Sequence, residues 1–330
     1  MRGGHNNEKQ LSRPCRNRYT GEVLALLHQD VCGHADDLAR QFAAAQPFRH
    51  VVIEPFLDPQ FCSELIAQFP PFESGDARNE RGEQAGKSVI GAIARLGPAY
   101  RQFDRLMRDG EFLTLVGRIT GIPGLLYDGD YIGGGTHENR AGQELDSHVD
   151  FNYHPRLGWH RRLNLIVFLN PQWEESWGGS LELLREPSDD SDGARRSVAP
   201  LANRAVIFET TESSWHGFPV IRTPPGISRK SLAVYFYSHK RPAAEMVPSH
   251  GTYYYQRPLP RHIQAGYTLT EDDVAEIRKL FTRRDQHIRF LYDREQEYSI
   301  TLEGIHRWKS FRVARALAWP ARALKRVAGR

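Results

Sequence analysis

Apolar residues near the N-terminus recur at intervals close to one turn of a helix. The apolar positions between residues 22 and 45 are Val23, Leu26, Leu27, Val31, Leu38 and Phe42. This spacing predicts one or two short helices. The run His50–Leu57 indicates a strand, and Asp58 followed by Pro59 marks the N-cap and first residue of a helix. A further helix is expected over Tyr100–Ile119.

Between residues 125 and 237 the pattern changes to short apolar runs interrupted by glycine, proline and asparagine, which is typical of antiparallel β structure. The expected strands are Leu125–Ile132, Leu163–Leu169, Ser180–Leu184, Arg204–Phe208 and Ser231–Tyr237. The acidic, serine-rich stretch Pro187–Ala194 predicts an exposed loop between two of these strands. The middle of the chain is therefore expected to be a β-rich domain.

Helical spacing returns over Glu271–Glu297, with many charged positions. From Arg307 onward the chain carries eight Lys or Arg residues and no acid, interleaved with apolar residues. Such a segment fits a helix on a membrane surface or on a partner. A solvated basic tail, or a helix packed on the body, is the simpler interpretation, because the pattern is weakly specific and Pro320 interrupts it.

The pattern thus predicts three parts. Residues 1–46 form an N-terminal tail with short helices, residues 47–245 form the β-rich domain, and residues 246–330 form a helical extension that ends in a basic tail.

The composition narrows the class of protein. A hydrophobic fraction of 40% and a charged fraction of 25% are ordinary for a soluble globular chain. The 44 basic residues are nearly balanced by 40 acidic ones, which does not favour a nucleic-acid partner. Cys15, Cys32 and Cys62 lack the spacing of a disulfide framework or a zinc site. With no secretory leader or membrane-spanning run, the expected location is the cytoplasm.

Ser147-His148-Val149-Asp150 is the sharpest chemical feature. In a strand, side chains two apart share a face, so His148 and Asp150 would lie side by side. His216 lies far enough downstream to return on a neighbouring strand. Two histidines and one carboxylate form the facial set that suits iron(II), whereas zinc usually prefers other ligand sets. The competing histidines are His154, His160, His239 and His250.

A second feature lies on the last predicted strand, where Arg229 and Ser231 share a face and Lys230 points the other way. A guanidinium can donate two hydrogen bonds to a carboxylate, and a neighbouring hydroxyl can add a third. Arg222 is a second candidate for the same role. An exposed arginine at a strand start is the alternative for Arg229.

The order of these motifs, with RRLNLIVFLN and WGGSLELL between HxD and the second histidine, resembles the 2-oxoglutarate and iron(II)-dependent oxygenases. The similarity is to their prolyl 4-hydroxylase-like branch and covers roughly residues 47–240. It implies an α+β fold with a double-stranded β-helix, a jelly-roll core, flanked by N- and C-terminal helices. Residues 47–245 would then be the oxygenase domain.

The same resemblance implies residue roles. His148, Asp150 and His216 match the Fe(II) ligands, while Arg229 and Ser231 match the groups that hold 2-oxoglutarate. Asn164 shares a face with Ile166 and Phe168 on the strand that lines the co-substrate pocket, and Phe168 stands where relatives often carry a tyrosine. The turn Gly178-Gly179 matches the start of a core strand.

The implied reaction uses Fe(II), 2-oxoglutarate and O2 to hydroxylate an unactivated C–H bond, with release of succinate and CO2. Because halogenating relatives lack the metal-binding carboxylate, Asp150 favours hydroxylation. A small molecule such as an amino acid, a sugar or a secondary metabolite is the expected substrate. The alternatives are a prolyl or other protein side chain, a non-catalytic jelly-roll binding protein, and a scaffold that acts through the basic C-terminus.

No substrate-binding residue or oligomeric state follows from the sequence. The segments expected near the mouth of the site, each of which could equally serve packing, are Gly133–His137, Phe151–Tyr153, Trp173 and Trp177.

Overall fold

The computed structural model describes residues 22–72, 76–78, 84–189 and 191–308. The chain divides into two compact units, Met1–Tyr255 and Gln256–Arg330. Within the described ranges, no helix combines the length and apolar character that crossing a bilayer requires. The predicted N-terminal tail, Cys15 and the basic segment beyond Trp308 lie outside the described residues.

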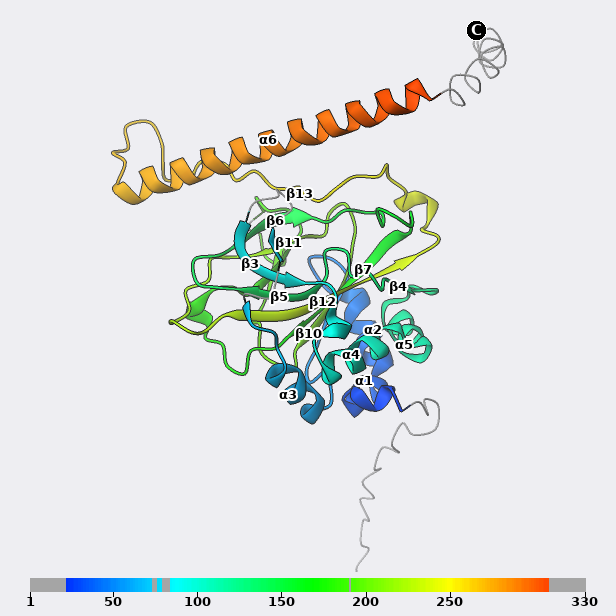
Figure 1. The fold of residues 1–330 in the computed structure, drawn as a ribbon. Helices are drawn as coiled ribbons and strands as arrows, with labels where there is room; N and C mark the ends of the chain where they lie inside the picture. The colour runs from blue at the N-terminus through cyan, green and yellow to red at the C-terminus, as the bar shows by residue number, and fades with distance from the viewer. Residues whose placement is uncertain (1–21, 73–75, 79–83, 190, 309–330) are drawn as a thin grey trace, which may run out of the picture. The chain divides into compact units, whose positions relative to one another are not determined.

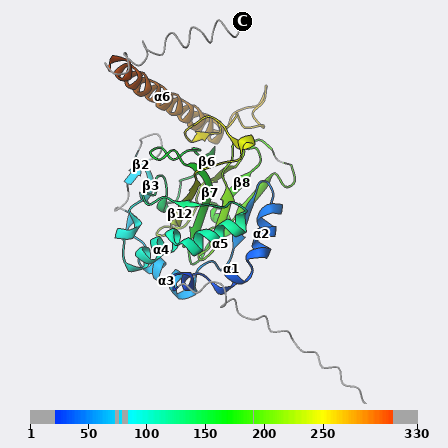
Figure 2. The same cartoon turned by 90° about the vertical axis from the view of Figure 1, so that its right-hand side faces the viewer.

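Helices gather on one side of the strands in the first unit (Figures 1 and 2). The α-helices are α1 (Gln29–Gly33), α2 (Ala35–Ala44), α3 (Pro59–Ala67), α4 (Pro98–Arg108) and α5 (Gly110–Thr120). The short 3-10 helices are Leu24–Leu26, Ile93–Arg95, Glu175–Trp177 and Ala243–Glu245. The apolar faces of α1 to α5 share one hydrophobic core with the sheet beneath them.

The larger sheet has the order β1-β10-β7-β12-β5-β3-β2, with β4 also paired to β12. Its strands are β1 (His50–Ile53), β2 (Asp76–Arg78), β3 (Gln84–Ile90), β4 (Leu126–Tyr127), β5 (Gly135–Asn139), β7 (His160–Phe168), β10 (Ala205–Glu209) and β12 (Arg229–Ser238). The smaller sheet has the order β13-β6-β11-β8-β9. Its strands are β6 (Leu145–Val149), β8 (Leu181–Leu184), β9 (Arg195–Val198), β11 (Trp215–Phe218) and β13 (Tyr253–Tyr254).

Strand β7 separates two hydrophobic cores. Leu163, Leu165 and Val167 belong to the core that the helices cover, whereas Phe168 belongs to a second core. The other buried members of that second core are Leu181, Leu183, Val198, Val206 and Phe208, which come from both sheets. The layers are therefore helices, larger sheet and smaller sheet. This confirms the predicted α+β class with a jelly-roll core and the predicted alternation along β7.

Most predicted elements are found, including the strand at His50, the helix capped by Asp58 and the loop between β8 and β9. The single helix predicted over residues 100–119 is wrong. The chain forms two helices there because the Asp109 carboxylate accepts hydrogen bonds from the amides of Glu111 and Phe112, which caps a new helix.

The strand predicted over Leu125–Ile132 is also wrong beyond Tyr127. Asp128 accepts hydrogen bonds from the amides of Asp130 at 2.8 Å and Ile132 at 3.0 Å, which folds the segment into a turn. Tyr131 has a positive φ of 48° within it.

The second unit contains α6 (Glu271–Arg307). Its N-terminus carries a capping box, in which Thr270 and Asp273 exchange side chain to backbone hydrogen bonds. The helix predicted over Glu271–Glu297 is confirmed and continues for ten more residues, to Arg307.

Asp109→Ala tests the cap that separates α4 from α5. We expect the free energy of unfolding to fall by about 1 kcal/mol, because two amides at the start of α5 lose their acceptor. Urea unfolding followed by circular dichroism measures the change. Asp109→Ser keeps an oxygen acceptor and should recover most of the loss; an equal loss in both variants would contradict the capping role.

Candidate metal centre and co-substrate pocket

The register of the smaller sheet brings two histidines together. His216 on β11 lies directly opposite His148 on β6, and their ring centroids are 4.2 Å apart. Asp150 directly follows β6, with carboxylate oxygens 3.7 Å from His148 Nε2 and 3.4 Å from His216 Nε2. One ligand atom from each of the three residues lies within 4.8 Å of the others. The structure thus assembles the three residues that the sequence singled out.

Both imidazole rings are oriented by backbone carbonyls two residues earlier in the chain. His148 Nδ1 is 2.9 Å from the carbonyl of Asp146, and His216 Nδ1 is 3.0 Å from that of Ser214. A carbonyl can only accept, so each Nδ1 carries a proton, which in a neutral ring leaves the lone pair on Nε2. Both Nε2 atoms are therefore ready to coordinate a metal.

Asp150 is held by two residues of β7. The Asn164 Nδ2 group donates to Asp150 Oδ2 at 2.8 Å, and the Arg161 guanidinium lies 2.9 Å from the same oxygen. Arg161 also donates to Asn164 Oδ1 through Nε and Nη2, at 3.0 and 2.8 Å. Asn164, which we expect to face the co-substrate, thus contacts the metal-binding carboxylate directly.

A β-bulge explains how Arg161 reaches this side of the sheet. Phe236 of β12 lies opposite Leu163, whereas its neighbour Tyr237 lies opposite Arg161. Arg162 is therefore an extra residue in β7, and a bulge of this kind redirects the side chains beside it.

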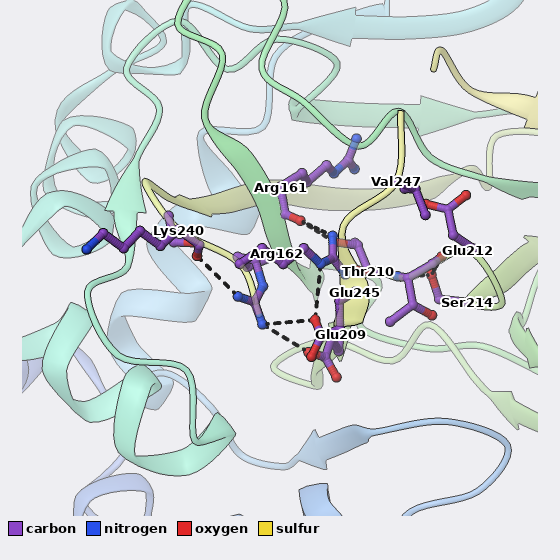
Figure 3. Close-up of polar contacts among 12 residues, drawn as sticks. Arg161, Arg162, Glu209, Thr210, Glu212, Ser214, Lys240, Glu245 and Val247 are labelled. Atoms are coloured by element: carbon purple, nitrogen blue, oxygen red, sulfur yellow. Dashed lines mark hydrogen bonds and ion pairs between the residues drawn. The ribbon is translucent and has the colours of Figure 1, made fainter. Parts of the chain in front are cut away.

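The two arginines consequently point in different directions (Figure 3). Arg161 is buried and packs against the rings of Phe151 and Tyr235, with its guanidinium carbon 4.4 and 3.5 Å from their centroids. Arg162 instead lies 3.4 Å from Glu209 and 3.6 Å from Glu245. Only Arg161 contributes its charge to the metal centre.

The electrostatics of the centre favour metal binding. Although burial alone would raise the pKa of Asp150, the Arg161 guanidinium and the two imidazoles hold it below its usual range. Burial, and then the neighbouring His148 ring, lowers the pKa of His216 to about 4. At neutral pH the centre therefore presents a carboxylate and a neutral His216. This donor set, with no sulfur in it, fits Fe(II) with open coordination positions.

Arg229 is the second buried arginine near the centre. It is 4% exposed, and its guanidinium carbon lies 4.3 Å from the ring centroid of Phe218 and 5.1 Å from that of Phe168. Burial lowers the pKa of Arg229 to about 9, so it remains charged at neutral pH. Among the described residues no carboxylate forms an ion pair with it. A buried cation without a counter-ion indicates a site for an anionic ligand.

The Gly178-Gly179 turn positions Arg229. The Gly179 carbonyl accepts a hydrogen bond from Arg229 Nε at 2.7 Å. Gly179 has a φ of +68°, and a Cβ there would lie 3.0 Å from Trp173 and from Ile221, so only glycine fits without a shift. Trp173 and Trp177 pack edge to face in this buried cluster, with centroids 5.6 Å apart. Their burial and mutual contact fit packing, one of the two roles that the sequence left open.

His137 adds a group to this pocket that sequence reasoning placed only at its mouth. Ser231, itself buried, lies opposite His137 of β5 on one side and opposite Phe168 of β7 on the other. The Nε2 atom of His137 is buried and has no hydrogen-bond partner among the described residues. Burial, then the charges of Lys87 and Arg229, lowers the pKa of His137 well below its usual value. A neutral imidazole is thus available to a ligand beside Arg229.

The competing candidates lie elsewhere. His154 Nδ1 accepts hydrogen bonds from two backbone amides, His250 Nε2 lies 3.0 Å from Glu212, and His160 packs on a tyrosine ring. His239 is exposed beside Trp159. Arg222 is exposed, which favours Arg229 as the residue for an anionic ligand.

The segment from residue 247 to 255 closes one side of the metal centre, which the sequence did not reveal. Asn152 donates to the Pro248 carbonyl at 2.9 Å, and Tyr153 donates to the Val247 carbonyl at 3.3 Å. The segment then pairs with β6 as β13, which places Tyr254 opposite His148 with ring centroids 5.2 Å apart. The pair Asn152 and Tyr153 thus ties this covering segment in place.

Comparisons with known proteins agree with this arrangement. Residues 134–237 match the family model of the 2OG-Fe(II) oxygenase superfamily. No curated protein matches the chain in sequence.

Several solved structures are similar at low identity. A prolyl hydroxylase from Trichoplax adhaerens, in complex with a hypoxia inducible factor peptide fragment, is 16% identical with a TM-score of 0.47 over 66% of this chain and 94% of that chain. A prolyl 4-hydroxylase from Phytophthora capsici is 19% identical with a TM-score of 0.46 over 92% and 91%. The non-heme alpha-ketoglutarate-dependent epimerase SnoN from nogalamycin biosynthesis is 16% identical with a TM-score of 0.40 over 62% and 84%. At these TM-scores the substrates of those proteins carry no argument about this chain.

His148→Ala tests the metal centre. We expect the affinity for Fe(II) to fall more than about 100-fold, because one of three ligands is lost. Anaerobic calorimetric titration with Fe(II) measures it. His239→Ala is the matched control, since the exposed His239 lies outside the ligand set. Equal Fe(II) affinities of His148→Ala and wild type would show that the metal binds at another site.

Arg229→Ala tests the anion site. The affinity for 2-oxoglutarate should fall about 100-fold while Fe(II) binding persists, because a buried charge pair is lost. Without ligand the thermal midpoint should not fall, since the variant removes an unpaired buried charge. Titration of the Fe(II)-loaded protein measures the affinity, with Arg222→Ala as control. A loss in Arg222→Ala alone would reassign the role to Arg222.

Proposed function

We propose that this chain, whose residues 134–237 form a domain of the 2OG-Fe(II) oxygenase superfamily, hydroxylates an unactivated C–H bond of a small molecule. Enzymes of this superfamily are dioxygenases that require Fe(II), 2-oxoglutarate and O2. The overall change converts 2-oxoglutarate, O2 and a C–H bond into succinate, CO2 and an alcohol. Each equivalent of alcohol thus accompanies one equivalent of succinate.

One observation carries the proposal. His148, Asp150 and His216 converge at the smaller sheet, while Arg229, which has no carboxylate partner among the described residues, belongs to the facing larger sheet. The two sheets meet at this point, because Phe208 of the larger sheet packs on the His216 ring at 4.8 Å. A metal-binding triad and a buried cation on facing sheets suit a ligand that chelates metal at one end and carries a carboxylate at the other.

The residues of the site have three roles: to bind the metal, to bind 2-oxoglutarate and to position these groups. His148, Asp150 and His216 would hold Fe(II), which when bound supplies the activation of O2 for C–H oxidation. Arg229 would bind the distal carboxylate of 2-oxoglutarate, with Ser231 and His137 as neighbouring hydrogen-bonding groups. The further residues hold and orient these groups: Arg161 and Asn164 fix Asp150, and Phe168 excludes water. Retention of Asp150 supports hydroxylation over halogenation.

Two features support a small substrate with a polar oxygen. The covering segment that Asn152 and Tyr153 tie beside His148 narrows the approach to the metal centre. Arg161 Nη1 is buried and has no hydrogen-bond partner among the described residues, so it can donate to a carboxylate, carbonyl or hydroxyl oxygen. An amino acid, a sugar or an oxygenated secondary metabolite meets both conditions.

Succinate formation is the first test. Anaerobically purified protein is given Fe(II), 2-oxoglutarate and O2, and succinate is measured by mass spectrometry. We expect slow release of succinate without substrate, and release reduced to the background of protein-free controls in His148→Ala. His239→Ala should match wild type. No succinate, together with no binding of Fe(II) or 2-oxoglutarate, would overturn the proposal and favour a non-catalytic jelly-roll binding protein.

A substrate screen then tests the substrate class. Free amino acids, sugars and proline-containing peptides are added separately, and succinate release above the basal rate identifies a substrate. Stimulation by small molecules, with one oxygen atom gained per succinate, would support the proposal. Stimulation by peptides alone would replace it with prolyl or other protein side-chain hydroxylation.

A further inference from the structure

Helix α6 exposes large apolar side chains along its length. It runs without interruption over the 37 residues from Glu271 to Arg307 (Figure 1). The most exposed of its regularly spaced apolar residues are Phe281 at 61%, Tyr298 at 57%, Leu302 at 54%, Leu291 at 49% and Ile288 at 44%. A contiguous exposed apolar surface of this kind marks an interaction site.

The apolar residues follow the heptad spacing of a coiled coil. Positions that alternate three and four apart are Val274, Ile277, Phe281, Arg284, Ile288, Leu291, Glu295, Tyr298, Leu302 and Ile305. Eight of these ten are apolar, and the pattern persists over more than four heptads. Sustained spacing of this length is typical of a helix that pairs with another helix along one seam.

We call these ten positions the seam. Its two charged residues, Arg284 and Glu295, determine which partner fits. In a parallel pair of identical helices each residue faces its own copy, so Arg284 would face Arg284 and Glu295 would face Glu295. In an antiparallel pair centred between Arg289 and Phe290, each Arg284 faces Glu295 of the other helix. The antiparallel pair therefore replaces two repulsive layers with two ion pairs.

The same antiparallel register matches every remaining layer. It places Val274 opposite Ile305, Ile277 opposite Leu302, Phe281 opposite Tyr298, and Ile288 opposite Leu291. No apolar residue of the seam faces a charge. The seam of α6 therefore matches a second, antiparallel copy of itself in every layer. Pairing with a helix of unrelated sequence would not require this self-complementarity.

We propose that α6 pairs with α6 of a second copy of this chain as an antiparallel coiled coil, which makes the protein a homodimer. The two Arg284–Glu295 layers contribute little to stability but select the orientation. The two Thr270 ends would lie at opposite ends of the coiled coil, about 58 Å apart.

The chain just before α6 leaves this seam accessible. Leu259 and Arg257 line a cavity of about 70 Å³ with Ile277, Leu280, Phe281 and Arg284. This contact ends at Arg284, and Phe281 remains 61% exposed beside it. The rest of the seam, from Ile288 onward, has no part in that cavity.

Charge reversal of the full chain tests the proposal. Sedimentation equilibrium should show a wild-type dimer at micromolar concentration. Arg284→Glu and Glu295→Arg should each weaken dimerisation about 100-fold, because each places like charges in two seam layers. The double variant Arg284→Glu with Glu295→Arg restores opposite charges in both layers and should dimerise like wild type. Fe(II) affinity should be unchanged in all variants, which shows that the first unit remains folded.

Arg289→Glu is the matched control, since it makes the same charge change on an exposed position outside the seam. It should leave the dimer intact. A monomeric wild type would overturn the proposal and indicate that the seam is covered within one chain. Single variants that dimerise normally, or a double variant that remains monomeric, would exclude the antiparallel register.

Discussion

The buried ion pair between Asp150 and Arg161 is the interaction on which the rest of the site depends. Burying the Asp150 carboxylate between the two sheets without a positive partner would be costly. Its pKa would rise, and the carboxylate would become protonated. Arg161 supplies the opposite charge, Asn164 links the pair to β7, and the rings of Phe151 and Tyr235 pack against the guanidinium. The pair thus keeps a metal ligand ionised and oriented before any metal binds.

The contrast between Arg161 and Arg229 explains how one sandwich holds two different sites. Both guanidinium groups are buried, but Arg161 faces Asp150, whereas Arg229 faces two phenylalanine rings and a single carbonyl. Burial of the Arg161 charge is offset by its ion pair with Asp150. Burial of the Arg229 charge would be offset by an anionic ligand. The protein therefore carries an Asp150 carboxylate that is already paired, and an Arg229 guanidinium that has no carboxylate partner among the described residues.

The residues that could be predicted from the sequence are those related by short-range spacing along the chain. His148 and Asp150 are two apart, Arg229 and Ser231 share a face, and Asp58 before Pro59 sets a helix start, so each followed from the period of a strand or from a cap. The helix predicted over residues 100–119 failed because the aspartate at its middle was not recognised as a cap. A polar residue followed by glycine inside a helical pattern is the signal that could have revealed it.

The sequence by itself determined the fold class, the metal-binding set and the heptad spacing of α6, because each depends on a short-range period along the chain. Only the tertiary structure decided that Arg161 joins Asp150, since a bulge in β7 breaks the alternation that places residues 161 and 164 on opposite faces. It likewise decided that His137 lies beside Ser231 and that Tyr254 lies beside His148. These contacts depend on strand register between distant segments, and register is set by packing across the sheets, not by any local pattern.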